Sequence, residues 1–89
     1  MVSERELERL LKAVANKKRI AIIRHLKTGT ATVGEIAKAI KLSIKATSHH
    51  LQLLSGAGYV VSEQEGLYVR YIVNPQTEQA TRILKTVTF

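Results

Sequence analysis

The stretch TVGEIAKAIKLSIKATSHHLQLL, residues 32–54, contains two helical patterns separated by a short turn. Thr32 and Glu35 have the spacing of a capping box, which begins a short helix. A turn follows at residues 40–43, and Ser43 then caps a longer helix that should run to Leu54 or Ser55 before Gly56. Helical spacing places a set of mostly apolar side chains inward: Ile36, Ala37, Ile40, Leu42, Thr47, Leu51 and Leu54. Two helices joined in this way have helix-turn-helix organisation.

The outward face of the second helix carries short or hydrogen-bonding side chains around one cation. Such a face suits a helix that enters the major groove of DNA with its N-terminus first. An ordinary helical hairpin with a solvated face is the alternative reading. The residues predicted to contact DNA are Ser43, Ile44, Lys45, Ser48, His49 and Gln52.

Two adjacent histidines, His49 and His50, stand in the middle of this helix. Neighbours on a helix are rotated by about 100° and cannot converge on one metal ion, whereas residues three or four apart can. Counting from Ser43, His50 falls at the edge of the inward stripe and His49 on the outward face. We therefore expect His50 to stabilise the fold and His49 to contact DNA. Metal binding through His25 would need a dimer or a contact that the sequence does not show.

The segments on either side complete a small, mostly helical fold. Ser3 and Glu6 form a capping box before the apolar stripe of a first helix, and Asn16 caps a second helix that ends at Thr28-Gly29. This second helix carries Ile20, Ile23 and Leu26.

After Gly58 the apolar period changes from 3.6 to 2, and YVVSEQEGLYVRYIVN, residues 59–74, predicts a hairpin with Gly66 near its middle. Asn74-Pro75 begins a last helix, whose apolar side is Ala80, Ile83, Leu84 and Val87. The predicted order is α-α-α-α-β-β-α in a single domain, residues 1–89.

The positive charge is concentrated in one region. The chain has a net charge of +7, and residues 12–45 hold nine bases against one acid, Glu35. A basic region of this kind is typical of nucleic-acid binding, although a solvated basic face or a patch for anionic membranes has the same composition. The residues predicted to contact phosphates are Lys17, Lys18, Arg19, Lys38 and Lys41.

Several functional classes are excluded by the composition. The chain has no cysteine, so disulfides and thiolate metal sites are absent. The charged start, MVSERELERL, argues against a signal peptide, and no apolar run approaches the ~18–20 residues of a membrane span. We expect a soluble, cytoplasmic protein with no membrane partner. No phosphate loop, acid pair or nucleophile–base arrangement predicts an enzyme, and nothing indicates a cofactor.

The residues GEIAKAIKLSIKATSHHLQLLSGAGYV (34–60), followed by EGLYVRYIV (65–73), resemble the ArsR/SmtB-type winged helix-turn-helix transcriptional repressors. The resemblance extends from LLKAVANKKRIAIIRHL (10–26) to the last helix. It implies a homodimeric repressor of an inverted-repeat operator in double-stranded DNA, often released by a metal or another inducer, here unidentified. It also implies a wing with Gln64, Gly66 and Arg70, and a dimer interface formed by Leu7, Leu10, Leu11, Val14, Ile83, Leu84 and Val87.

The sequence also departs from the pattern of this family. The helix VGEIAKAI lacks the Cys-x-Cys pair of arsenic and cadmium sensors, and the last helix offers only Glu78 for a zinc-type site. The wing tip, EQEG, is acidic where the family usually has bases. Lys41 stands where many such turns have glycine, so we expect strain in the turn. We therefore predict a sequence-specific DNA-binding regulator, a homodimeric repressor without the known metal sites. A winged-helix protein-interaction module is the alternative.

Overall fold

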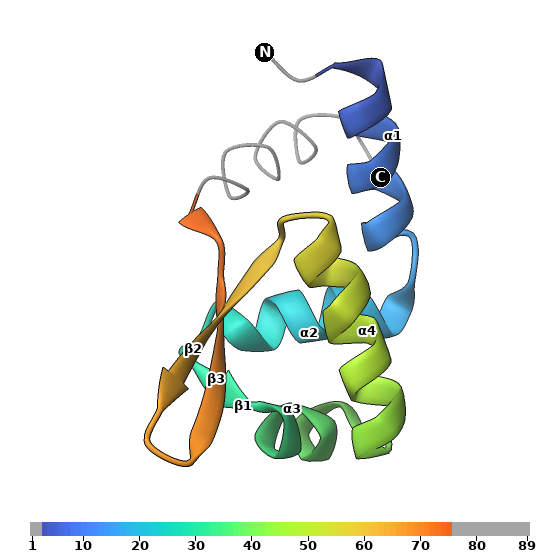
Figure 1. Ribbon diagram of the computed structural model, residues 1–89. Helices are drawn as coiled ribbons and strands as arrows, with labels where there is room; N and C mark the ends of the chain where they lie inside the picture. The colour runs from blue at the N-terminus through green and yellow to red at the C-terminus, as the bar shows by residue number, and fades with distance from the viewer. Residues whose placement is uncertain (1–2, 76–89) are drawn as a thin grey trace.

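The computed structural model describes residues 3–75, apart from the side chain of Leu10. Its elements in chain order are α1 (Glu4–Val14), α2 (Lys17–Leu26), β1 (Ala31–Thr32), α3 (Val33–Ile40), α4 (Ile44–Gly56), β2 (Val60–Glu65) and β3 (Tyr68–Val73), as labelled in Figure 1. The predicted order of four helices and a hairpin is confirmed. The last helix that the sequence predicts, with Ile83, Leu84 and Val87, lies outside the described residues.

Each helix begins after the residue predicted to cap it, because a side-chain oxygen accepts a backbone N–H of the first turn. Ser3, Asn16 and Ser43 act in this way for α1, α2 and α4. At α3 the full capping box forms: Thr32 Oγ1 accepts from the Glu35 backbone at 3.2 Å, and Glu35 Oε1 accepts from the Thr32 backbone at 2.9 Å.

The sheet has three strands in the order β1-β3-β2, all antiparallel, where the sequence predicted a hairpin alone. The additional strand, β1, pairs Ala31 with Tyr71 and Thr32 with Arg70. Two residues are too few to show an alternating pattern, so this strand left no signal in the sequence. Its pairing places the N-terminus of α3 beside the hairpin.

The hairpin turns where the sequence predicted. Glu65 pairs with Tyr68, which leaves Gly66 and Leu67 as a two-residue turn. Gly66 has a φ of 60°. Glycine at the first position of such a turn is the type II′ arrangement, which matches the twist of the two strands.

The core lies where α2, α3 and α4 meet the sheet, and the predicted inward residues of α3 and α4 occupy it. Ile36, Leu51, Leu54 and the polar Thr47 are almost completely buried. In α2, Ile22, Ile23 and Leu26 are buried, whereas Ile20 is exposed. The other buried members of the core cluster are Ala13, Ala31, Ile40, Tyr59 and Val60.

The two ends of the molecule differ in what they present. Figure 1 shows α1 at one end, and the N-terminal turn of α4 together with the hairpin tip at the opposite end. Within residues 3–75, no helix combines the length and apolar character needed to cross a bilayer.

Candidate nucleic-acid interface

The turn between α3 and α4 sets the position of α4, the helix proposed to contact base edges and called the reading helix below. Lys41 ends α3 with φ 56° and ψ 53°, in the left-handed region. A non-glycine residue there costs about 1–2 kcal/mol, so the strain predicted from the sequence is present. The backbone N–H of Leu42 donates to the Ala37 carbonyl at 3.0 Å, and Lys18 Nζ donates to the Ile40 carbonyl at 2.8 Å. These bonds satisfy two of the carbonyls in the last turn of α3.

The helical phase predicted for α4 is confirmed by its burial pattern. Thr47, Leu51 and Leu54 are buried. Among the predicted DNA-contacting residues, Ile44 is 59% exposed and Ser48 is half-buried; the exposed remainder are Ser43, Lys45, His49 and Gln52.

Two of these six residues have additional structural roles. The hydroxyl oxygen of Ser43 accepts the Ala46 N–H at 3.1 Å and so serves as the helix cap. Gln52 lies about two turns beyond the start of α4 and lines a groove next to α1. Because Gln52 lines this groove, its side chain is less available to contact a duplex than the outward residues nearer the start of α4.

The adjacent histidines diverge, with ring centroids 6.3 Å apart and planes inclined at 54°. His49 is exposed, whereas His50 is half-buried with Nδ1 3.4 Å from Nη1 of Arg19. A guanidinium group only donates, so His50 Nδ1 is the acceptor and the proton of the neutral ring is on Nε2. Burial lowers the pKa of His50 below its ordinary value, and the charges of Arg19 and His49 lower it further.

Arg19, predicted to contact phosphate, is half-buried and bonds to the end of α1. Its Nε donates to the Ala13 carbonyl at 2.6 Å and its Nη2 to the Lys12 carbonyl at 3.3 Å. A cation that donates to the last carbonyls of a helix neutralises the negative end of the helix dipole. Arg19 therefore joins α1, α2 and α4, which leaves its guanidinium group less available for the phosphate contact predicted for it.

The other predicted phosphate contacts are exposed lysines. Lys17, Lys38 and Lys41 are exposed, and so is Lys18, although one of its donors is used on the end of α3. Residues 36–62 contain no acid. The start of α4 therefore lies in a positive field that would attract a polyanion.

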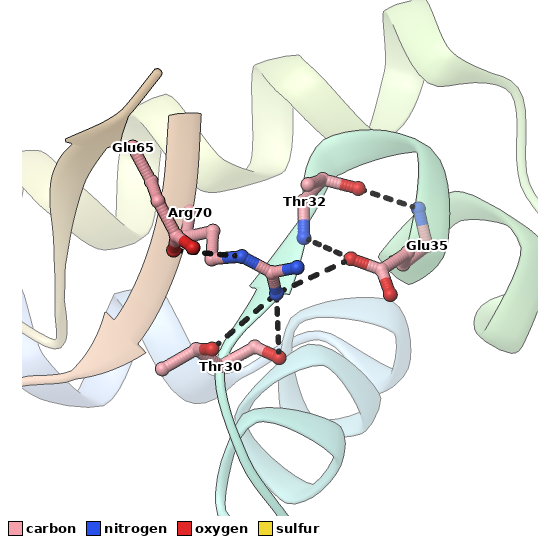
Figure 2. Close-up of polar contacts among 5 residues, drawn as sticks. All are labelled: Thr30, Thr32, Glu35, Glu65 and Arg70. Atoms are coloured by element: carbon pink, nitrogen blue, oxygen red, sulfur yellow. Dashed lines mark hydrogen bonds and ion pairs between the residues drawn. The ribbon is translucent and has the colours of Figure 1, made fainter. Parts of the chain in front are cut away.

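Arg70, predicted as a wing residue, ties the hairpin to α3 instead of extending from its tip (Figure 2). Its Nε lies 3.1 Å from Glu65 Oε2, and its Nη1 lies 3.6 Å from Glu35 Oε1 and 3.4 Å from Thr30 Oγ1. The pKa of Glu35 is lowered, chiefly by its hydrogen bonds with Thr32 and less by the charges of Arg70 and His25. The wing is thus braced against the N-terminus of α3.

The hairpin tip is acidic and apolar. Gln64 Nε2 donates to the Gly66 carbonyl at 2.9 Å, which stabilises the turn. Glu63 and Glu65 are exposed, and Leu67 is 97% exposed. Because the guanidinium of Arg70 faces Glu65 and Glu35, it leaves the tip without a free cation among the described residues. Such a tip has no electrostatic attraction to a phosphate backbone.

Comparison with known proteins identifies the family. A family model described as bacterial regulatory protein, ArsR family, matches residues 16–62. The chain belongs to the ArsR family. The transcriptional repressor SdpR of Bacillus subtilis is 31% identical over 68 residues, which cover 76% of each chain. The regulator CmtR of Mycobacterium tuberculosis is 38% identical over 68 residues, which cover 76% of this chain and 58% of CmtR.

The fold agrees with that of a solved winged helix-turn-helix domain. The homodimeric winged helix-turn-helix DNA-binding domain of Mb0332 from Mycobacterium bovis superimposes with a TM-score of 0.83 at 29% identity, covering 93% of this chain and 77% of the other. The chain is therefore a winged helix-turn-helix member of a family of transcriptional regulators, which are not enzymes.

Sequence reasoning missed the contact between Arg19 and His50. The two residues are 31 positions apart, so no local spacing connects them. It also missed the bracing of the wing by Arg70, which depends on the unpredicted strand β1. A basic residue opposite acids on the paired strand was the one available signal, since Arg70 pairs with Glu63 in the hairpin register.

Proposed function

We propose that this protein is a cytoplasmic, sequence-specific DNA-binding regulator that represses transcription as a homodimer. The observation that carries the proposal is the exposed N-terminal turn of α4, which lies in an acid-free segment with Lys38, Lys41 and Lys45 around it. A capped helix with such an environment fits the major groove of duplex DNA. The repressor role is supported by the similarity to SdpR.

The surface divides into groups that set affinity and groups that set specificity. Phosphate contacts are assigned to Lys17, Lys18, Lys38 and Lys41, each exposed. Base contacts are assigned to the outward side chains of the first two turns of α4, namely Ser43, Ile44, Lys45, Ser48 and His49. Arg19 and Gln52 are left out because their side chains have other neighbours.

Dimerisation is assigned to the apolar stripe of α1 and the segment after β3. Leu7 and Leu11 are 39% and 36% exposed on α1, and Val14 is half-buried. The stripe also includes Leu10, and its proposed counterparts are Ile83, Leu84 and Val87. The Mb0332 domain, similar in fold, is homodimeric. A two-fold axis would place two reading helices about 34 Å apart, which matches an inverted repeat one helical turn long.

The family's known metal-sensing sites are not part of this proposal. The chain contains no cysteine, and residues 3–75 contain no group of three or more His, Cys, Asp or Glu side chains able to hold a metal ion. We therefore expect stoichiometric zinc, cadmium or arsenite to leave operator binding unchanged. Release from DNA that a chelator reverses would show a metal site.

The test is selection of bound duplexes from a random pool, followed by sedimentation of the protein alone and with the selected duplex. We expect enrichment of an inverted repeat bound by a dimer. Leu11→Arg should weaken the dimer and DNA binding together, because a charge in an apolar interface loses its hydration without a partner. Leu67→Arg is the matched control for dimerisation, since Leu67 lies at the exposed hairpin tip. A dimer that survives Leu11→Arg would remove α1 from the interface.

One observation favours the alternative of a protein-interaction module. The hairpin tip exposes Leu67 and Tyr68 next to Glu63 and Glu65, a combination suited to a protein partner. The same selection separates the two functions, because a module that binds protein alone would enrich no duplex sequence.

A further inference from the structure

A second basic surface lies away from the proposed reading face. It is a groove between α1 and the C-terminal half of α4, with a volume of about 500 Å³. One side carries Arg5, Arg9 and Lys12, and the other side is formed by Leu53 and Ala57. The volume is within the range of small-molecule sites. Figure 1 shows α1 at the end opposite to the N-terminal turn of α4, so duplex binding does not explain these cations.

The charges of this groove are only partly neutralised by the protein. Its one acid, Glu8, faces Lys12 at 3.1 Å in an exposed pair. Arg5 and Arg9 have no ion-pair partner among residues 3–75. They lie one turn apart on the same side of α1, where like charges repel. An anion between the two guanidinium groups would relieve that repulsion, and a carboxylate could accept paired hydrogen bonds from either one.

The apolar side of the groove indicates more than an inorganic anion. Leu53 is 44% exposed within it, whereas Leu51 and Leu54 of the same helix are buried. A ligand that covered Leu53 would remove apolar surface from water while its charged group met the arginines.

The cationic side of α1 faces away from its leucine stripe. Helical rotation of about 100° per residue places Leu7 and Leu11 on the side of α1 opposite to Arg5 and Arg9. A partner subunit seated on the leucine stripe would therefore leave the cationic side free.

We propose that the groove between α1 and α4 binds an organic carboxylate with an apolar body, and that its occupancy lowers affinity for DNA. The carboxylate lies between Arg5 and Arg9, and the apolar body lies on Leu53 and Ala57. The second part rests on the proposed function. Its direction follows from the contact of Arg19 with His50, because a ligand that loosens this contact loosens the packing that holds α4 in place.

Arg19 connects this groove to the reading helix. It lines the groove, donates to the carbonyls that end α1, and lies 3.4 Å from His50 in α4. A ligand that shifts α1 against α4 therefore acts on a contact that holds both helices. Such coupling requires that the ligand bind the two arrangements with different affinity.

The first test uses the full chain without DNA, with octanoate as the probe in a ¹H–¹⁵N NMR titration. We expect saturable shifts at residues 5–13 and 52–57. Acetate, which lacks an apolar body, and octyltrimethylammonium, which has the opposite charge, should not produce them. Arg5→Gln combined with Arg9→Gln should weaken octanoate binding by roughly tenfold or more, the size expected for a lost charge-assisted contact. Lys27→Gln, an exposed cation outside the groove, is the control and should change nothing.

A second groove, between α2 and α3, is lined by Ile20, Arg24 and Ala39 among others. Three results would overturn the binding site: no saturable shift, shifts confined to the leucine stripe or to this second groove, or unchanged affinity in the double arginine variant. The second test titrates a selected duplex with and without octanoate. We expect weaker duplex binding with octanoate for the wild type and no effect for the double arginine variant. Unchanged or stronger duplex binding would overturn the coupling. If the protein enriches no duplex at all, the proposed function fails while the NMR result still decides the site.

Discussion

Nη1 of Arg19 and Nδ1 of His50 lie 3.4 Å apart, which connects α2 to the centre of the reading helix. The same guanidinium donates to the Ala13 and Lys12 carbonyls at the end of α1. One side chain therefore holds three helices, and it requires an unprotonated acceptor on His50. His49, one residue earlier, is exposed on the outward face. The two histidines consequently have different roles.

Replacing each histidine separately should show these roles. His50→Ala removes a packed side chain that accepts a hydrogen bond, and we expect a loss of about 1–3 kcal/mol in unfolding free energy. His49→Ala should leave the melting temperature almost unchanged and weaken specific DNA binding by roughly 1–3 kcal/mol if it contacts a base. Melting curves and duplex titrations on both variants measure the two effects. If the effects were exchanged, the assigned reading face of α4 would be wrong.

The lowered pKa of His50 predicts a pH dependence of stability. Burial and the neighbouring charges of Arg19 and His49 lower the folded-state pKa below 6.5, so the unfolded chain binds more protons in the window just below that value. The contribution of His50 to the free energy of unfolding is fully present above pH 6.5. It is lost as pH falls from there through the folded-state pKa. In His50→Gln this decline should disappear, whereas His49→Gln should retain it. Chemical denaturation across this range is the measurement, and an unchanged profile in His50→Gln would contradict the assignment.

The lowered pKa of Glu35 predicts a second pH dependence of stability, at more acidic pH. Its hydrogen bonds with Thr32 lower its folded-state pKa below 4.5, so its contribution is present above pH 4.5 and is lost as pH falls through the folded pKa. Glu35→Gln should therefore be less stable than the wild type at neutral pH, and the difference should vanish in acid. Glu63→Gln, on the exposed side of the hairpin, is the control. A difference that persists in acid would show that Glu35 acts through packing instead.

Thr47 offers a substitution that should raise stability. Its side chain is completely buried, and among residues 3–75 its Oγ1 has no hydrogen-bond partner. A buried hydroxyl without a partner destabilises the fold, so Thr47→Val should increase the unfolding free energy by about 1 kcal/mol. Thr47→Ala is the control, because it removes the packed methyl group as well as the hydroxyl. It should not increase the unfolding free energy. A less stable Thr47→Val would reveal a hydrogen bond to the hydroxyl.

Local signals in the sequence were sufficient to predict the described helices, their N-terminal caps and the hairpin turn. Ser3, Asn16, Thr32 and Ser43 each bind the first turn of the helix that follows them, because capping depends on residues two or three positions apart. The strain at Lys41 was predictable for the same reason, since the end of a helix commonly takes a left-handed residue.

Features that depend on distant residues were not predictable in this way. The strand β1 has two residues and exists because Tyr71 and Arg70 lie opposite it. The prediction that Arg19 contacts phosphate rested on its charge alone. It could not take into account the carbonyls and the histidine that folding brings close to the guanidinium group. Local sequence pattern was thus enough to locate the reading helix. Only the folded structure shows which basic side chains already bond to other parts of the protein.

The most direct test of the central claim is the salt dependence of binding to the selected inverted repeat, measured for the wild type and for Lys38→Gln. If exposed lysines around α4 contact phosphates, affinity should fall by orders of magnitude between low and moderate salt. Lys38→Gln should reduce the logarithmic salt slope by about two, since each subunit of the dimer loses one contact. Affinity that is indifferent to salt, or an equal slope for both proteins, would contradict the assignment of this surface to duplex DNA.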